Sequence, residues 1–228
     1  MKKRILSLLL VFAMVFSLIP STALAVADTQ GASAEQANPF ADVKETDWFY
    51  DAVQYARVNG FFSGTSKTTF EPNGTMTRGM FVTCLGRLAG VEGDAASTGY
   101  RDLSAGHYAA PYAAWAKEAD IMRGLPDGRF APDAPITRQE LATALARYAA
   151  LCGAEGGDTS APVYHDQAAI ADWAKDGVAL CGQLGLLVGA NGTFSPTDTA
   201  TRAMGAVILQ RLNEADLRPQ PVENGSNI

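Results

Sequence analysis

Three threonine–arginine pairs are the clearest candidates for binding chemistry in the sequence. Thr77-Arg78, Thr137-Arg138 and Thr201-Arg202 each precede a stretch with helical spacing of apolar residues. A threonine at a helix N-cap accepts a backbone N–H, and the free amides and positive dipole end of that helix start favour an anion. A guanidinium placed there can form a charge-assisted, bidentate bond to a carboxylate. The three arginines are therefore candidate sites for a carboxylate-bearing ligand.

The arginines recur because the chain contains three copies of one unit. Each copy opens with an aromatic residue, any residue and Asp, and the opening aromatic lies 38 residues before the arginine. Each copy also contains a Phe-x-Pro element, whose Phe lies eight residues before the arginine. The matching residues are Phe40, Asp42, Phe70 and Arg78; Tyr100, Asp102, Phe130 and Arg138; Tyr164, Asp166, Phe194 and Arg202. A fixed period of this kind indicates a repeat architecture.

Each copy predicts two helices joined by turns. In the first helix, pairs such as Val53 and Ala56 place apolar side chains on one face. Helix-stop signals follow in all three copies, and the second helix carries an apolar residue seven positions after each arginine. These residues are Gly60, Asp120 and Gly185 for the stops, and Leu85, Leu145 and Leu209 for the inner face. Turns such as Asn191-Gly192 are consistent with either a very short hairpin or an irregular loop. We expect a mainly all-α fold of three helix-loop-helix repeats.

An internal role is the alternative for the three arginines. Each could pair with a nearby aspartate, Asp42, Asp102 or Asp166, and simply fix a loop. A second set of arginines lies nine residues further along each helix, far from the helix start, and we expect it to be solvated or structural. That set is Arg87, Arg147 and Arg211. An aromatic residue before the first helix could stack on a sugar face, but helical spacing favours a place in the core; these are Trp48, Tyr108 and Trp173.

The first residues predict a secretory signal peptide. A basic leader precedes an apolar run over Ile5–Ile19, and small residues follow Pro20. We expect cleavage after Ala25, with cleavage after Ala27 as the second choice. A permanent membrane anchor is the alternative, but the run is short for a spanning helix of about 20 residues. The mature chain is therefore expected outside the cytoplasm, with no membrane span.

Charge and cysteine content argue against several classes of function. Removing residues 1–25 takes away three basic groups and no acidic ones, so the net charge moves from −6 to −9. This charge argues against general nucleic-acid binding, which needs clustered Lys and Arg. The three cysteines, Cys84, Cys152 and Cys181, form no CxxC pair and are most simply buried apolar residues, although a Cys152–Cys181 disulfide is open. No catalytic or metal-binding motif occurs, so we expect neither catalysis nor a cofactor.

The repeated pattern resembles the S-layer homology domain. The resemblance rests on F-x-D, a tryptophan, a glycine, F-x-P and a T-R-A-E-like element, and it covers about residues 40–214. The glutamate of T-R-A-E occurs here only as Glu140, since Met80 and Met204 occupy its position in the other copies. Only the Thr137–Glu140 element can complete a capping box. The resemblance implies a helical pseudo-trimer with grooves between its repeats.

The resemblance also implies a function and a division of the chain. Family members bind secondary cell-wall polymers, often through pyruvylated N-acetylmannosamine, so we expect non-covalent anchoring to a Gram-positive-type cell wall. Arg78, Arg138 and Arg202 would then bind the glycan, with the three aspartates and Glu140 as groove support. A wall-associated scaffold that binds another protein or a different wall polymer is the alternative. The expected segments are a signal peptide (1–25), a linker (26–39), repeats at 40–90, 100–151 and 164–214, connectors at 91–99 and 152–163, and a polar tail (215–228).

Overall fold

The computed structural model describes residues 38–93, 97–156 and 160–219. The chain separates into two units, Met1–Glu35 and Gln36–Ile228, and every described residue belongs to the second. The predicted signal peptide and nearly all of the predicted linker lie outside the described residues. The same holds for most of the predicted polar tail and for the middle of each connector.

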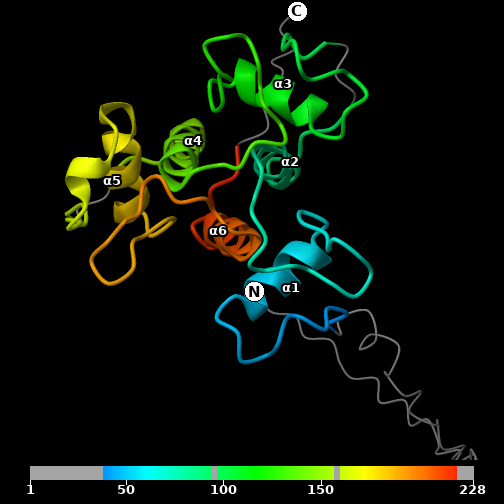
Figure 1. Cartoon of the computed structure of the whole chain (residues 1–228), viewed down its shortest axis with the longest axis horizontal. Coiled ribbons are helices and arrows are strands. Elements are labelled where there is room, and N and C mark those ends of the chain that lie inside the picture. The colour runs from blue at the N-terminus through cyan, green and yellow to red at the C-terminus, as the bar shows by residue number, and fades with distance from the viewer. Residues whose placement is uncertain (1–37, 94–96, 157–159, 220–228) are drawn as a thin grey trace, which may run out of the picture. The chain divides into compact units, whose positions relative to one another are not determined.

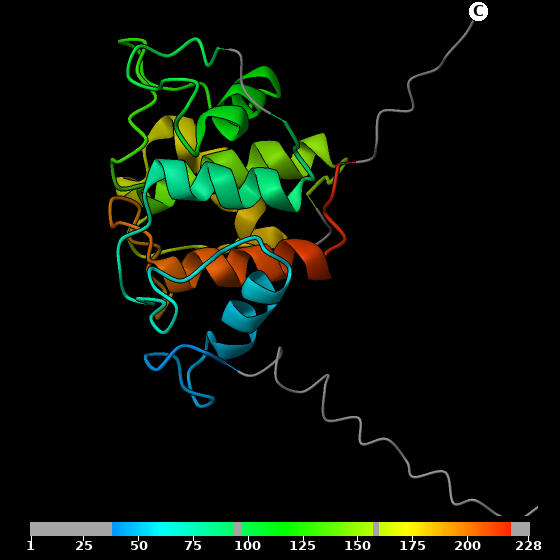
Figure 2. The ribbon, with the colours of Figure 1, turned by 90° about the vertical axis from the view of Figure 1, so that its right-hand side faces the viewer.

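The described residues are mainly helical, as the sequence predicts, and contain no β-strand. The α-helices are α1 (Tyr50–Val58), α2 (Arg78–Leu88), α3 (Ala110–Glu118), α4 (Arg138–Leu151), α5 (Lys175–Gln183) and α6 (Arg202–Glu214). Two short 3-10 helices, η1 (Gln167–Ala169) and η2 (Asp172–Ala174), precede α5. Each repeat thus supplies one shorter helix (α1, α3 or α5) and one longer helix (α2, α4 or α6). The longer helices occupy the centre of the repeat region, with the shorter ones outside them (Figures 1 and 2).

The shorter helix of each repeat packs against the longer helix of the preceding repeat. Thus α3 packs on α2, and α5 packs on α4. The first helix, α1, packs on the last helix, α6, so the third repeat precedes the first in this cyclic order. The arrangement confirms the predicted pseudo-trimeric packing of three helix-loop-helix repeats.

The predicted inner faces form the core. Val53 and Ala56 of α1 are fully buried, and so are Leu85 of α2 and Leu145 of α4. The phenylalanines of the three Phe-x-Pro elements are also fully buried; these are Phe70, Phe130 and Phe194. Because the same positions are buried in every repeat, the sequence period reflects one shared packing scheme.

The cysteines are free thiols. Cys84 and Cys181 are buried, and burial raises the pKa of each to about 12. The Cys181 Sγ donates a hydrogen bond to the carbonyl of Ala142. Cys152 is half-buried, and the structure does not join it to Cys181. Since a thiolate is the reactive form, burial and the raised pKa both disfavour reaction of these two thiols at neutral pH.

The predicted helix stops adopt left-handed conformations. The φ angles are 70° at Gly60, 59° at Asp120 and 67° at Gly185, and the next residue folds back onto its helix in each case. The Asn191-Gly192 turn has positive φ at both residues and is flanked by an isolated bridge between Ala190 and Thr193. Two central residues with positive φ are typical of a tight hairpin turn. This turn therefore forms the very short hairpin that the sequence left open.

Candidate binding site in grooves between the repeats

A cyclic set of backbone hydrogen bonds joins the segments that begin the three longer helices. The Met76 N–H donates to Ala200 O (2.9 Å), the Ala200 N–H donates to Ile136 O (2.9 Å), and the Ile136 N–H donates to Met76 O (3.0 Å). All three residues are fully buried. The N-termini of α2, α4 and α6 are therefore fixed together at the centre of the repeat region.

The amides at these helix starts are already bonded within the protein. The threonine side chain of each N-cap accepts from the third residue of its helix, and Thr137 with Glu140 completes the predicted capping box. The amides of Arg138 and Gln139 donate to Asp198 O (2.9 Å) and Pro196 O (3.0 Å), and α2 and α6 have the corresponding bonds. The expectation that free amides at these positions would hold an anion is therefore wrong, because the neighbouring repeat supplies their acceptors.

The three arginines that begin the longer helices are buried and link neighbouring repeats. Only 6% of Arg78, 7% of Arg138 and 4% of Arg202 is exposed. Each Nε donates to the carbonyl of a Phe-x-Pro phenylalanine in the next repeat, and each guanidinium lies over the ring of that phenylalanine. The Nε–O distances are 2.9 Å from Arg78 to Phe130, 2.7 Å from Arg138 to Phe194 and 2.7 Å from Arg202 to Phe70. Burial lowers the pKa of all three guanidinium groups, which nevertheless stay charged at neutral pH.

The repeat aspartates accept hydrogen bonds from the backbone amides of the same Phe-x-Pro segments. Asp42 accepts from the amides of Phe70 (2.9 Å) and Glu71 (2.7 Å), and Asp102 and Asp166 make the matching bonds in their repeats. Although burial tends to raise the pKa of Asp42, these amide bonds hold it below its usual value. No ion pair joins an aspartate of this set to one of the three arginines in the described ranges. The two groups act from opposite sides of one backbone segment.

The residue between Phe and Pro adopts a left-handed conformation in every repeat. Its φ is 59° at Glu71, 55° at Ala131 and 57° at Ser195, and none of these residues is glycine. Such a conformation is costly for a residue with a side chain. The aspartate on its amide side and the arginine on its carbonyl side stabilise the turn.

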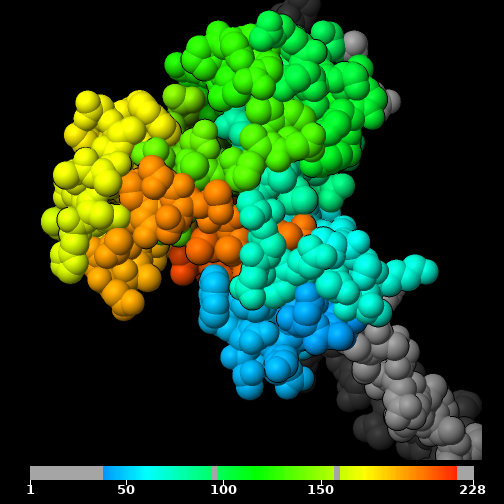
Figure 3. All heavy atoms as spheres, in the orientation of Figure 1, coloured from blue at the N-terminus to red at the C-terminus, as the bar shows by residue number. Residues whose placement is uncertain are grey.

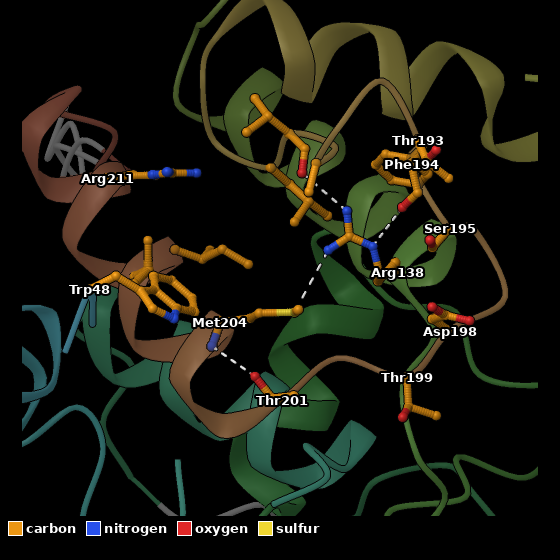
Figure 4. A pocket seen from close by; sticks show the side chains of 15 residues that line it. Trp48, Arg138, Thr193, Phe194, Ser195, Asp198, Thr199, Thr201, Met204 and Arg211 are labelled. Carbon is orange, nitrogen blue, oxygen red and sulfur yellow. Dashed lines mark hydrogen bonds between the residues drawn. The ribbon is translucent and has the colours of Figure 1, made fainter. Parts of the chain in front are cut away.

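Two cavities lie along the longer helices. The first, which we call the α6 groove, has a volume of about 540 Å³ and is lined by Trp48, Arg138, Val188, Met204 and Arg211 among others (Figure 4). These side chains come from all three repeats. In the space-filling view, the blue surface of the first repeat lies near the orange surface of the third, with a recess between them (Figure 3).

The second cavity, the α4 groove, has a volume of about 400 Å³ and the same construction. Its lining includes Arg78, Leu125, Glu140, Arg147 and Trp173. Trp173 corresponds to Trp48, and Arg147 corresponds to Arg211. Both volumes are in the range of small-ligand sites. Two of the three predicted binding arginines therefore lie in cavities.

The tryptophans at the groove rims are exposed, contrary to the expectation from the sequence. The exposed fraction is 68% for Trp48 and 58% for Trp173, and the matching Tyr108 is 51% exposed. The expectation was wrong because these residues lie before the α-helix of their repeat begins, where α-helical spacing does not apply; Trp173 lies in the 3-10 helix η2 that precedes α5. The next residue takes the inward position instead, as Phe49 does beside Trp48.

The second set of arginines includes two groove residues. Arg147 and Arg211 are half-buried, and their Nη1 atoms donate to Ile121 O (3.5 Å) and Leu186 O (3.3 Å). A sequence signal for their position exists, since Arg211 lies seven residues after Met204. Residues seven apart share one helix face, so both side chains line the same groove. Although Arg147 and Arg211 lie far from the start of their helices, both therefore line the grooves.

The described residues contain neither a metal-binding cluster nor a membrane-spanning helix. No group of three or more His, Cys, Asp and Glu side chains in residues 38–93, 97–156 and 160–219 could hold a metal ion. Within the same residues, no helix is long and apolar enough to cross a bilayer. The grooves instead combine an exposed aromatic, apolar walls and guanidinium groups, which suits a ligand with apolar faces and negative charge.

Comparison with known proteins identifies the repeats. The family described as S-layer homology domain matches residues 39–79, 99–142 and 163–203. An endoglucanase from Bacillus sp. (strain KSM-635) is 32% identical over 92% of this chain and 22% of its own length. The S-layer protein sap of Bacillus anthracis is 27% identical over 85% of this chain and 23% of its length. A cellulosome-anchoring protein of Acetivibrio thermocellus is 31% identical over 50% of this chain and 26% of its length. This chain thus spans a quarter or less of most of these relatives.

Proposed function

Because the chain belongs to the S-layer homology domain family, we propose that it attaches to the cell surface by binding an anionic cell-wall polymer in its grooves. The names of its relatives, an S-layer protein and a cellulosome-anchoring protein among them, support a place at the cell surface. The polymer in this proposal is a secondary cell-wall glycan with pyruvylated N-acetylmannosamine, on a Gram-positive-type wall.

The composition of the α6 groove is the observation that carries this proposal. An exposed indole, Trp48, and two guanidinium groups, from Arg138 and Arg211, line one cavity with apolar walls. Aromatic rings provide flat apolar surface for the faces of a sugar ring, and a guanidinium matches a carboxylate in geometry and charge. A pyruvyl ketal places one such carboxylate on an otherwise neutral sugar.

The arginines have both a structural and a binding role in this proposal. Arg138 uses Nε for Phe194 O and Nη2 for Val188 O (3.0 Å), and its Nη1 faces the Met204 sulfur at 3.6 Å. A thioether is a weak acceptor, so Nη1 is the part of the guanidinium available to a ligand carboxylate. Asp166 supports this geometry through the Phe194 amide.

Repetition of the groove suits attachment to a polymer. The α6 and α4 grooves have equivalent construction, so one chain can engage two units of the same glycan strand. Binding of the second unit is then intramolecular, and weak single sites give firm attachment. Only 22% of the endoglucanase relative's own length matches this chain, and this limited match fits a non-catalytic anchoring role for the chain.

Export is part of the same proposal. Residues 1–25, or 1–27, act as a signal peptide, so the mature chain begins at Val26 or Asp28. The intact mass of wall-associated protein tests this directly. A mass that includes Met1 would contradict export with cleavage.

Sedimentation with isolated cell walls tests the anchoring function. Protein without residues 1–25 is mixed with walls before and after the secondary polymer is extracted, and the bound fraction is measured. We expect binding to intact walls and its loss from extracted walls. Undiminished binding to extracted walls would instead indicate another wall component, as in the scaffold alternative.

A further inference from the structure

The two grooves differ in the residue that faces the buried arginine. In the α4 groove, the Arg78 Nη1 lies 3.5 Å from Glu140 Oε1. In the α6 groove, the equivalent Arg138 Nη1 faces the Met204 sulfur. The facing residue is the third residue of the next repeat's longer helix, so Glu140 belongs to the groove of Arg78 and not to that of Arg138. At α2, Arg202 Nη1 faces the Met80 sulfur at 3.9 Å, as in the α6 groove.

The difference changes the charge that each groove offers a ligand. Glu140 is a carboxylate with 30% of its side chain exposed, and it pairs with an arginine whose side chain is only 8% exposed. In the α4 groove, Arg123 also pairs with Asp120. A ligand carboxylate that approached Arg78 would meet Glu140 as a negative neighbour.

The two grooves are alike in having an outer arginine, Arg147 or Arg211, and they differ in whether the buried arginine has a carboxylate partner. Arg138 and Arg211 line the α6 groove, and Asp198 is the acidic residue in its lining. Among the described residues, no carboxylate lies within ion-pair distance of either arginine. Arg138 is buried, so the attraction of its guanidinium for an anion is screened less than that of a surface charge.

We propose that the methionine or glutamate at the third position of the longer helix decides which groove takes an anionic ligand. The α6 groove, with Met204, binds the carboxylate of the wall glycan first. The α4 groove, with Glu140, binds the same ligand more weakly and accepts a neutral sugar about as well. This inference rests on the proposed function, and it assigns an order of occupancy to grooves of similar shape.

The tryptophans allow each groove to be observed separately. The chain contains three tryptophans: Trp48 in the α6 groove, Trp173 in the α4 groove, and Trp115 on α3 against Tyr148. Each indole N–H gives its own signal in a nitrogen–proton NMR spectrum. Trp115 lies outside the lining of both grooves and serves as an internal control.

The test is a titration of protein lacking residues 1–25 with the methyl glycoside of pyruvylated N-acetylmannosamine. We expect the Trp48 signal to reach half of its total shift at about tenfold lower ligand concentration than the Trp173 signal, as for one unfavourable charge contact. In Met204→Glu, the Trp48 curve should move to about tenfold higher concentration. Met204→Gln, which has similar size but no charge, should move that curve clearly less than Met204→Glu does, because its carbonyl can accept from the Arg138 Nη1 without adding a negative charge.

Glu140→Gln provides the reciprocal change in a variant that should fold like the wild type. A glutamine can still accept the Thr137 amide, so the capping box is retained. We expect the Trp173 curve to move toward lower concentration in this variant. If both indoles shift together in the wild type and neither charge change moves them, the order of occupancy is wrong, although binding itself stands. If neither indole shifts in any variant, the proposed glycan function is contradicted.

Discussion

The centre of the repeat region and the rims of its grooves differ in how closely the three repeats agree. At the centre, each repeat makes the same N-cap bond, the same arginine–carbonyl bond and the same aspartate–amide bonds. At the rims, the facing residue is Met80, Glu140 or Met204, and the aromatic residue is a tryptophan or Tyr108. Three copies that pack around one centre require the same contacts there, whereas the residues at the groove rims can differ between repeats without disturbing that packing.

This comparison assigns different energetics to the two regions. Contacts at the centre are buried, so their loss leaves unpaired polar groups and lowers the stability of the fold. At the rims the aromatic side chains are exposed and the facing residues are only partly buried, so their replacement should affect what the grooves bind more than the stability of the fold. Arg138 and Arg78 belong to both regions, since each is bonded at the centre and also lines a groove.

The largest expected effect is on stability, from Arg138→Met. This change removes the guanidinium N–H groups that donate to Phe194 O and Val188 O, and both carbonyls lose that side-chain donor. We expect the free energy of unfolding to fall by about 2–4 kcal/mol, measured by urea denaturation. Arg138→Lys should also lose stability, because a lysine cannot serve both carbonyls with the same geometry.

Arg211→Met is the matched control at the rim. Arg211 is half-buried and has one weaker contact, the 3.3 Å bond to Leu186 O. Its replacement should cost about 1 kcal/mol or less. Equal losses for the two variants would remove the distinction between centre and rim.

The next effect is on binding, from Trp48→Ala. Because the side chain is 68% exposed, we expect the free energy of unfolding to change by about 0.5 kcal/mol or less. Affinity for the pyruvylated sugar should fall about tenfold, as for an aromatic contact in a binding site. Calorimetry measures both the affinity and the heat of binding.

Leu151→Ala is a control for exposed apolar surface, since Leu151 is 45% exposed and lies outside the lining of the α6 groove. Its affinity should equal that of the wild type. A Trp48→Ala protein that binds normally would show that the rim aromatic does not contact the ligand.

The smallest effect concerns acid stability. Asp42, Asp102 and Asp166 have pKa values held below the usual value by their amide bonds. A group whose pKa is lower in the folded state contributes stability above its unfolded pKa and loses it as the pH falls through the folded pKa. We therefore expect the midpoint of thermal unfolding to decrease below about pH 4.

The Asp42→Asn variant should be less stable at pH 7, and its loss relative to the wild type should shrink at low pH. Thermal unfolding followed by circular dichroism at several pH values checks this. A loss that stays constant between neutral pH and acid would show that the charge of Asp42 makes no contribution.

Much of the fold follows from the sequence because the repeat is long and its signals agree. The threonine N-caps, the helix stops at Gly60 and Gly185, and the inner-face leucines were all predicted and are confirmed. The pairing of α1 with α6 could be predicted only through the family resemblance, since nothing in the local pattern says which repeat is the neighbour.

The candidate site was predicted less completely. The sequence identifies Arg138, but its acceptors Phe194 and Val188 are 56 and 50 residues away in the chain and belong to another repeat. The exposed position of Trp48 depends on where α1 begins, and helix boundaries are the least certain part of a sequence-based prediction. The pairing of Glu140 with Arg78 likewise depends on the order of the repeats in space.

Titration of the mature protein with purified wall polymer, before and after removal of its pyruvyl groups, tests the central claim most directly. Calorimetry at low and high salt would give the affinity for each polymer. We predict tight binding to the pyruvylated polymer, a loss of affinity of about tenfold or more without the pyruvyl carboxylates, and weaker binding at high salt. Equal affinity for both polymers would contradict recognition of an anionic glycan in these grooves.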